Sequence, residues 1–292
     1  MNTQKKGLLQ VHLAVLLFGM SSLFAKMVDL PGIVITFGRV LFSSLFLWLM
    51  LKMRKTEIRL RNRKDYGAFF IAGIILAVHW TTFMLSIQLS TVAVGTITFS
   101  TFPLFVTFLE PYLFHEKLKV SSVISAFVML AGVLCIVPEF QLSNSMTQGV
   151  LLGMVCSFSY AVLSLWNRKF VSTYQGSIVS FYEQGSAAIV LLPVMFFIRP
   201  SVTTMDVAGL LLYGIVCTAI AHSMFIEGLK HIRVQTAGII SGLESVYGIV
   251  AAIFLLHEIP TGKELIGGAI ILGVVFYNTC LLYTSDAADD KA

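Results

Sequence analysis

Charged residues are scarce in this sequence. They make up 12% of its 292 residues, whereas hydrophobic residues make up 57%. Soluble domains contain about 25% charged and roughly 45–50% apolar residues. A water-soluble fold of this length has no way to bury so much apolar surface, so the composition excludes a soluble protein and predicts an integral membrane protein.

The motifs of several large functional classes are also missing. The chain contains no Walker loop, no Gly-x-Gly-x-x-Gly, no His-x-x-Glu-His and no Cys-x-x-Cys. Without them, neither ATP drive nor a metal or redox centre has a recognisable place, and we expect no cofactor. The few cysteines lie in apolar stretches at irregular spacing, which is typical of small packing residues rather than of a disulfide framework. They are Cys135, Cys156, Cys217 and Cys280.

Long hydrophobic runs fill the chain almost from end to end. A helix needs about 20 mostly apolar residues to cross a bilayer core roughly 30 Å thick. The runs are long and continuous, whereas barrel strands are about 10 residues of alternating polarity. We therefore predict an all-α protein with ten transmembrane helices. They are expected near 8–28, 31–52, 66–87, 91–114, 119–138, 148–166, 178–198, 207–228, 233–256 and 263–283.

Lysine and arginine residues set the expected orientation, because they are retained on the cytoplasmic side in short loops. The loop after the second helix is the most basic and should be cytoplasmic, which places both termini in the cytoplasm. Only Arg199 and Lys263 then fall in outer loops. The net charge of +5 is explained by topology and requires no nucleic-acid partner. The inner residues are Lys5, Lys6, Lys52, Arg54, Lys55, Arg59, Arg61, Arg63, Lys64, Lys117, Lys119, Arg168, Lys169, Lys230 and Arg233.

The two ends of the chain need separate interpretation. Residues 1–25 resemble a secretory signal, but the apolar run is long and lacks a small-x-small cleavage site, which favours an uncleaved first helix. The tail 284–292 belongs to a stretch, Leu281–Asp290, that resembles a translated sequencing adaptor. We assign no function to this tail and interpret it as non-native.

An internal repeat divides the chain into two halves. A shift of 142 residues aligns His115-Glu116 with His257-Glu258 and brings the expected helix boundaries into register. The same shift pairs Phe83 with Phe225. We predict two five-helix repeats at 8–138 and 148–283. Because five is an odd number of crossings, the second repeat must be inverted relative to the first.

At these positions the sequence resembles the drug/metabolite transporter superfamily, specifically its EamA branch. Glu116 and Glu258 match the glutamate that closes the fourth and ninth helices of that family. The segment Leu243–Tyr247 is similar to the family's Leu-Glu-Pro-Val-Tyr, with Ser245 where proline is usual. Phe18-Gly19 stands where the first helix often has Trp-Gly. The resemblance covers residues 8 to about 279 and implies ten helices in two inverted repeats.

The resemblance also implies a central cavity between the halves, lined mainly by the first, third, fourth, sixth, eighth and ninth helices. The fourth and ninth helices contain glycine and proline, which are expected to interrupt them where a cavity accepts the freed backbone groups. We expect Gly95 and Pro103 to break the fourth helix. The glycines expected to loosen the ninth are Gly238, Gly242 and Gly248.

Polar side chains at bilayer depth indicate where the site lies, because an unpaired charge there costs about 2.5–3.5 kcal/mol on insertion scales. Glu244 is near the middle of the ninth helix, His79 and Trp80 are in the third, and His222 is in the eighth. We predict that these four bind substrate and that Glu244, His79 and His222 exchange a proton. The alternative is that they only hydrogen-bond across helices and that Trp80 only packs.

Other intramembrane charges have simpler explanations. Arg39 in the second helix needs a partner or a water path, and a structural or gating role is favoured over contact with the cargo. Glu183 occupies the corresponding place in the seventh helix, but the repeat inversion puts it near the opposite face, so we expect no Arg39–Glu183 salt bridge. Glu110 and Glu227 lie near the cytoplasmic ends, where their side chains reach the headgroups.

Aromatic and hydroxyl residues complete the predicted site. They would line a cavity suited to a small amphipathic metabolite such as an amino acid, although on a buried helix face they would be ordinary core. The predicted additional lining residues are Tyr160, Tyr247, Phe83, Thr96 and Ser100.

The most consistent function is a secondary transporter of small organic metabolites such as amino acids or amines, working by alternating access in the bacterial cytoplasmic membrane. We expect export, with proton coupling through Glu244 as one version. A flippase for a lipid-linked intermediate and a membrane-embedded lipid-modifying enzyme remain the alternatives; the enzyme is disfavoured because the polar residues are scattered. The partners are a small-molecule substrate and the lipid bilayer, and both a monomer and a homodimer remain open.

Overall fold

The computed structural model describes residues 3–114, 120–137, 141–167, 170, 173–232 and 234–289. Every regular element in these ranges is a helix, as the sequence predicts. The first half contains α1 (Thr3–Ser21), α2 (Phe24–Met27), α3 (Gly32–Met53), α4 (Arg63–Leu89), α5 (Val92–Phe99), α6 (Phe102–Phe114) and α7 (Val120–Ile136). The second contains α8 (Ser145–Asn167), α9 (Gly176–Ile198), α10 (Thr204–Leu212), η1 (Tyr213–Ile220), α11 (Ala221–Gly228), α12 (Val234–Leu255) and α13 (Gly262–Asp289).

Membrane-spanning length is evident in most of these helices. Within the described ranges, six stretches are long and apolar enough to cross a bilayer by themselves. They are Lys5–Met27, Gly32–Met53, Arg63–Leu89, Ser145–Asn167, Gly176–Ile198 and Thr204–Gly228. Shorter apolar helices occupy Val92–Val106, Val123–Ile136 and Ile240–Leu255. The chain is therefore a multi-pass membrane protein.

The expected break near Pro103 is present. The fourth predicted span is divided at Ser100 and Thr101, and Pro103 lies in the first turn of α6, where its missing N–H leaves no helical hydrogen bond unmade. The expected break at Gly95 is wrong, because α5 continues through this residue. Gly95 instead lets the backbone approach Ile87 of α4, since a Cβ there would lie 2.4 Å from the Ile87 side chain.

The ninth span also differs from its prediction. The expected loosening by glycines is wrong, because α12 runs without a break from Val234 to Leu255. Gly248 serves as a contact surface: a Cβ on it would lie 2.9 Å from the Ser22 hydroxyl and 3.3 Å from the Gly19 carbonyl oxygen. The irregular segment of the second half is instead in the eighth span, where η1 is a π-helix between α10 and α11.

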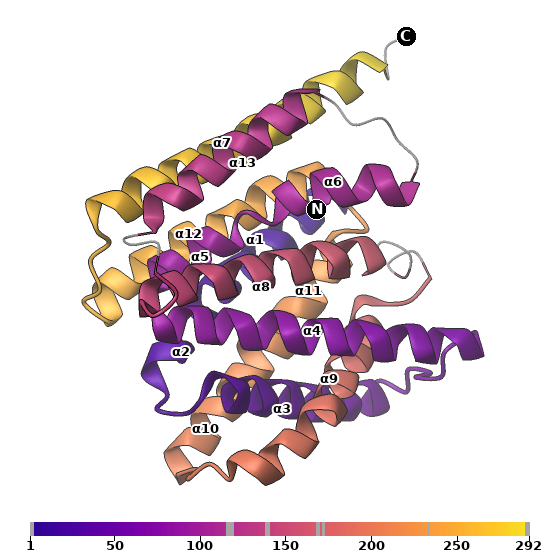
Figure 1. Ribbon diagram of the computed structural model, residues 1–292. Coiled ribbons are helices and arrows are strands. Elements are labelled where there is room, and N and C mark those ends of the chain that lie inside the picture. The colour runs from indigo at the N-terminus through magenta and orange to yellow at the C-terminus, as the bar shows by residue number, and fades with distance from the viewer. Residues whose placement is uncertain are drawn as a thin grey trace.

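The last helices of the two halves pack side by side and antiparallel. The last helices of the halves, α7 and α13, form a layer of their own (Figure 1). Gly132 of α7 lies against Ile270 and Ile271, whereas Ile136, one turn later, lies against Gly267. Residue numbers therefore increase along α7 while those of the facing residues of α13 decrease, so the two helices run in opposite directions. The second five-helix repeat is therefore inverted relative to the first.

Packing between the halves places the remaining helices around a common centre. In the first half α4 packs on α8 and α9, and in the second η1 and α11 pack on α3 and α1. The helices α5 and α6 contact α8, while α12 contacts α1. The long α4 and α8 lie side by side across the middle of the molecule (Figure 1). Each half thus contributes the same helices to the centre, and a cavity lies there.

Candidate substrate cavity

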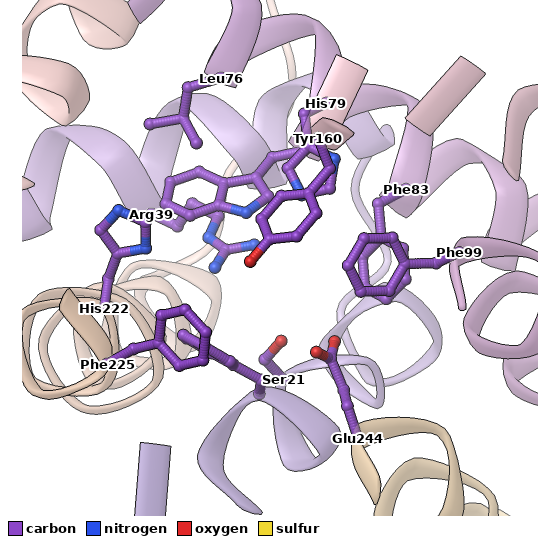
Figure 2. A pocket seen from close by; sticks show the side chains of 12 residues that line it. Ser21, Arg39, Leu76, His79, Phe83, Phe99, Tyr160, His222, Phe225 and Glu244 are labelled. Atoms are coloured by element: carbon purple, nitrogen blue, oxygen red, sulfur yellow. The ribbon is translucent and has the colours of Figure 1, made fainter. Parts of the chain in front are cut away.

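The central cavity is lined by side chains from both repeats. It contains about 510 Å³ of space that no protein atom fills, including the part open to solvent. Figure 2 shows the Arg39 guanidinium and the Tyr160 hydroxyl directed into this space from one side, and Glu244 and Ser21 from the other. The lining residues are Phe18, Ser21, Arg39, Leu76, His79, Trp80, Phe83, Phe99, Tyr160, His222, Phe225 and Glu244.

Arg39 is held between two aromatic rings. Its guanidinium carbon lies 3.8 Å from the centroid of the Trp80 ring and 4.4 Å from that of Tyr213. The side chain is 2% exposed, and its Nε donates a hydrogen bond to the Thr218 hydroxyl at 3.1 Å. Cation–π contacts of a desolvated guanidinium are worth about 2 kcal/mol or more. Within the described residues, the partners of Arg39 are therefore two aromatic rings and a hydroxyl, not a carboxylate.

The π-helix η1 explains how two partners of Arg39 come from one segment. Tyr213 and Thr218 are five residues apart, and the Thr218 hydroxyl donates to the Tyr213 carbonyl at 3.1 Å. The wider turn of a π-helix changes the angular spacing of side chains, and such segments often occur at functional sites. Gly214 lets η1 approach the backbone of α3, with the Arg39 carbonyl oxygen 2.9 Å from where a Cβ would be. This close approach positions the ring and the hydroxyl around one guanidinium.

His79 is oriented by a helix of the other half. Its Nδ1 lies 3.0 Å from the Cys156 carbonyl oxygen, which can only accept, so Nδ1 carries the proton. The imidazole also contacts two aromatic rings, with centroids 5.4 Å away for Phe99 and 5.0 Å for Tyr160. The His79 side chain therefore presents one fixed face to the cavity.

His222 also contacts Trp80 and pairs with a buried carboxylate. Its Nε2 is 3.1 Å from the Oε2 of Glu183, which is completely buried. The imidazole meets the Trp80 ring edge-to-face at 5.8 Å. Within the described residues, the ion-pair partner of Glu183 is His222.

Glu244 is the cavity's own carboxylate. It lies on α12, is 8% exposed, and forms no hydrogen bond or ion pair with any residue in the described part of the chain. Figure 2 shows His222 and Glu244 on opposite sides of the cavity. An isolated carboxylate that faces an aromatic enclosure is a natural partner for an organic cation.

Thr96, Ser100 and Tyr247 do not line the cavity. The Ser100 hydroxyl is 2.6 Å from that of Ser245, and Ser245 donates to the Thr96 carbonyl at 2.8 Å. Ser245, which stands where the family usually has proline, therefore joins α12 to α5. Tyr247 packs beside the first helix, where a Cβ on Gly19 would lie 2.7 Å from its Cβ.

The glutamate of the repeat motif has a structural contact in the second half. Glu258 follows α12, and its Oε1 accepts a hydrogen bond of 2.6 Å from the backbone N–H of Val92, the first residue of α5. It therefore occupies the positive end of a helix from the other repeat. Glu116, the matching residue of the first half, lies outside the described residues, as does the side chain of Glu110.

Several lining residues were not anticipated from the sequence. Phe225 could have been identified, because the shift of 142 residues pairs it with Phe83. Phe18, Ser21, Leu76 and Phe99 are ordinary residues for an apolar helix, and no sequence signal separates them from lipid-facing or core positions. The expected contribution of the first, third, fourth, sixth, eighth and ninth helices matches the observed lining, to which α3 adds Arg39.

The arrangement has the features of a carrier. An inverted pair of helical repeats encloses a small cavity near the middle of the bundle, and that cavity contains a carboxylate, a guanidinium and aromatic walls. In the described part of the chain, no three His, Cys, Asp or Glu side chains are grouped so that they could hold a metal ion. The fold and the cavity define a multi-pass membrane transporter.

Comparison with known proteins identifies the family. The model of the EamA-like transporter family matches residues 5–137 and again residues 147–280. The chain belongs to this family of transporters. One solved crystal structure superposes with a TM-score of 0.67 at 18% identity, covering 95% of this chain and 97% of that one. This likeness shows that the fold is shared.

Related proteins have names that agree with this class. An uncharacterized transporter of Archaeoglobus fulgidus is 24% identical over 91% of this chain and 93% of its own length. An uncharacterized inner membrane transporter of Salmonella typhimurium, YicL, is 24% identical over 94% and 95%. An S-adenosylmethionine uptake transporter of Rickettsia conorii is 22% identical over 88% and 85%. The relatives are named as transporters, not as enzymes, and the YicL relative is placed in an inner membrane.

Proposed function

We propose that this protein is a secondary transporter that moves a small zwitterionic metabolite of the amino-acid class by alternating access. The observation that carries the proposal is the pair of opposite charges, Arg39 and Glu244, facing one aromatic-walled cavity. A substrate with one charge would leave the other protein charge without a partner, which is costly at this depth. A zwitterion matches both.

The ammonium end of such a substrate would contact Glu244. This carboxylate has no partner in the described part of the chain, and the aromatic side chains Phe18, Phe99 and Phe225 line the same cavity. Aromatic faces attract organic cations, and a carboxylate in a poorly hydrated site adds a charge-assisted hydrogen bond. The cavity therefore favours an amine over a neutral solute of the same shape.

The carboxylate end would contact Arg39. A guanidinium has five N–H donors in a planar fork, and one of them, Nε, is used by Thr218. The rings of Trp80 and Tyr213 hold the guanidinium plane without using its charge in a salt bridge. Planar bidentate contact with a substrate carboxylate is the interaction for which arginine is best suited.

One relative is consistent with this substrate class. The R. conorii relative is named for the uptake of S-adenosylmethionine, a molecule with an amino-acid head group and a sulfonium cation. At 22% identity this supports the chemical class and not the particular substrate. Export, as expected from the sequence, remains a prediction: it is measured as solute loss from preloaded proteoliposomes compared with uptake into empty ones.

Binding of matched analogues tests the proposal. We expect L-amino acids to raise the Tm of the purified protein, whereas the corresponding amides and the des-amino acids do not. A ligand at 100 times its Kd stabilises the folded state by about 2.7 kcal/mol. Glu244→Gln should lose the response, and Glu57→Gln, which alters an exposed loop carboxylate, should keep it.

Transport gives the decisive outcome. Proteoliposomes containing the wild-type protein should exchange an internal amino-acid mixture for the same radiolabelled mixture added outside, and Glu244→Gln should reduce this exchange at least tenfold. The proposal is wrong if no zwitterion binds or exchanges, or if Glu244→Gln exchanges as fast as the wild type. Binding of the amides with equal strength would remove Arg39 from the site.

A further inference from the structure

A second polar site lies behind the cavity wall. Glu183 is completely buried on α9 and forms an ion pair with His222, yet its Oε1 has no hydrogen-bond partner within the described residues. A buried, unpartnered carboxylate oxygen costs about 1–3 kcal/mol or more unless water or a proton satisfies it. The substrate contacts proposed above do not use this pair.

A series of unpartnered hydroxyls continues from the pair toward one end of the bundle. Ser180 precedes Glu183 by three residues, which places it one turn nearer to the start of α9 on the same face. Ser223 follows His222, and its carbonyl oxygen lies 2.9 Å from where a Cβ on Gly176 would be. The hydroxyl oxygens of Ser180 and Ser223 are buried and lack partners in the described part of the chain.

The series ends at the cytoplasmic surface. Gly176 begins α9, and its N–H donates to the Oε2 of Glu227 at 3.2 Å. The Glu227 side chain is 38% exposed and pairs with Lys230 at 3.0 Å. The basic residues before α9 and after α11 place this end in the cytoplasm. Polar atoms therefore extend from the cavity wall at His222 to an accessible carboxylate.

We propose that the His222–Glu183 pair binds the proton that couples this transporter to a pH gradient, and that it exchanges this proton with the cytoplasm along the α9–α11 contact. The inference rests on the proposed transport function and assigns the proton to a site separate from that of the substrate. The step adds one proton to the pair and later removes it, with no other bond formed or broken. Buried hydroxyls that lack partners are the groups that ordered water satisfies, and such water can relay a proton.

The surroundings of the pair provide a physical link to the substrate. Trp80 meets the His222 imidazole edge-to-face. The Arg39 guanidinium lies over the face of the same indole, with its carbon 3.8 Å from the ring centroid. Adding a proton to the pair brings a second positive charge close to the Arg39 sandwich. The two cations repel each other, which favours an Arg39 that is neutralised by a substrate carboxylate or displaced toward the cavity.

Few other titratable groups face the pair. From the helices packed against α9 and α11, the nearby groups are Arg39 on α3 and His79 on α4, and across the cavity Tyr160 on α8 and Glu244 on α12. The first helix contributes only Lys5, Lys6 and His12, all exposed. Tyr213 and Cys217 of η1 lie on the Arg39 side. A titration seen at His222 is therefore separable from these groups by substitution.

Trp80 fluorescence tests proton binding without any substrate. Replacing Trp48 and Trp166 by phenylalanine leaves Trp80 as the only tryptophan, and a protonated imidazole next to an indole quenches its emission. We expect a pH titration of Trp80 emission that disappears in His222→Gln. Glu183→Gln removes the ion-pair partner of His222 and should change this titration. Glu57→Gln should leave the titration unchanged, and a titration that survives in His222→Gln overturns the proposal.

Coupled transport provides the second test. In proteoliposomes loaded with the amino-acid mixture, Glu183→Gln should exchange amino acids at the wild-type rate when the pH is equal on both sides. When a pH gradient is applied, this variant should accumulate at least tenfold less amino acid than the wild type. The double variant Ser180→Ala, Ser223→Ala should slow gradient-driven accumulation several-fold and leave exchange unchanged. Accumulation at the wild-type level in Glu183→Gln overturns the inference. If Glu183→Gln is not stably folded, the double variant decides, and gradient-driven accumulation at the wild-type level in Ser180→Ala, Ser223→Ala overturns the inference.

The outcomes separate the two proposals. A wild-type protein that exchanges amino acids but ignores a pH gradient refutes the proton site and leaves the proposed function standing. A wild-type protein that exchanges none of them refutes the proposed function. Gradient-driven accumulation that persists in Glu183→Gln, in a protein that still exchanges amino acids, refutes the His222–Glu183 site and leaves the proposed function standing.

Discussion

Arg39 brings a charged side chain into the middle of an apolar bundle, and two aromatic rings hold it there. A salt bridge would neutralise the guanidinium, whereas the faces of Trp80 and Tyr213 stabilise it and leave its charge available. Arginine suits this position because its planar group stacks on both rings at once. The two ring contacts therefore hold Arg39 in place and leave its charge free to bind an anionic group.

Replacing Arg39 by lysine tests this interpretation. An ammonium keeps the charge but has no plane to stack, so we expect Arg39→Lys to lower the affinity for the amino-acid mixture about tenfold or more. Arg199→Lys, at an exposed position, is the matched control. The measurement is the apparent KM for exchange in proteoliposomes. An unchanged KM would mean that the stacked geometry has no role in binding.

Tyr174 provides a prediction outside the membrane-spanning segments. Its hydroxyl donates to Asp65 and accepts from the Arg61 N–H at 3.0 Å, which joins two cytoplasmic connections. Burial and the hydrogen bond to Asp65 raise the pKa of Tyr174 above its usual value of 10.0. Because the folded state favours the neutral phenol, this stabilisation is present below the unfolded-state pKa and is lost as the pH rises through the folded-state pKa.

Tyr174→Phe should therefore lower the Tm at neutral pH, since it removes both hydrogen bonds. The difference in Tm between the wild type and the variant should shrink as the pH rises above about 10. Tyr112→Phe, at an exposed tyrosine, should show no such difference at either pH. A difference that is the same at pH 7 and pH 11 would contradict the assigned cause.

At the scale of elements, close helix crossings position the cavity side chains. α1 and α12 approach each other at Gly19, where a Cβ would lie 2.9 Å from the Glu244 carbonyl oxygen and 3.0 Å from the Gly248 N–H. Small residues at such crossings are typical of membrane helices, because dispersion contacts replace the missing hydrophobic force. The crossing brings Phe18 of α1 and Glu244 of α12 to the lining of one cavity.

Gly19→Ala should separate these helices. Its methyl group meets backbone atoms, which cannot move aside as a flexible side chain does, so overpacking of about 1–3 kcal/mol is expected. We expect a lower Tm and weaker amino-acid binding. Gly273→Ala, where nothing lies within 4 Å, should keep or raise the Tm, because alanine favours the helix. Equal behaviour of the two variants would show that the Gly19 crossing is not tight.

At the scale of the whole molecule, the inverted halves are joined by polar contacts at the outer end of the bundle. Glu258 of the second half accepts from the Val92 N–H of the first. Glu264, almost fully buried, accepts from the Thr91 hydroxyl at 2.8 Å. Within the first half, Lys26 donates to the Ser90 carbonyl at 2.7 Å. Any movement that opens this end must break the contacts between the halves.

Glu258→Gln should favour opening at this end, because an amide accepts the Val92 hydrogen bond more weakly than a carboxylate does. A single cysteine introduced as Ser21→Cys in a background without the native cysteines would report cavity access. We expect a membrane-impermeant thiol reagent to label it several-fold faster from outside in Glu258→Gln. Asp206→Asn, which alters a capping carboxylate within one helix, should not change the rate. Equal rates for Glu258→Gln and the wild type would remove this contact from the gate.

The sequence anticipated some residues of the cavity and missed others for a physical reason. Glu244, His79 and His222 stand out because polar groups are costly at bilayer depth, and the structure brings all three to the cavity. Phe18 and Leu76 carry no such signal, because apolar side chains are equally suited to lipid, core and cavity. Thr96 and Ser100 were expected in the lining and instead hydrogen-bond within their helix and to α12.

The all-helical fold, the membrane environment and the division into two inverted repeats followed from the sequence, because length, hydropathy and the odd number of crossings are properties of the chain alone. The tertiary structure decided which charges meet. It paired Glu183 with His222, placed Arg39 between Trp80 and Tyr213, and left Glu244 facing the cavity. These contacts depend on the rotation of each helix about its axis and on the wider turn of η1. Such angles are set by packing between helices far apart in sequence, which hydropathy does not encode.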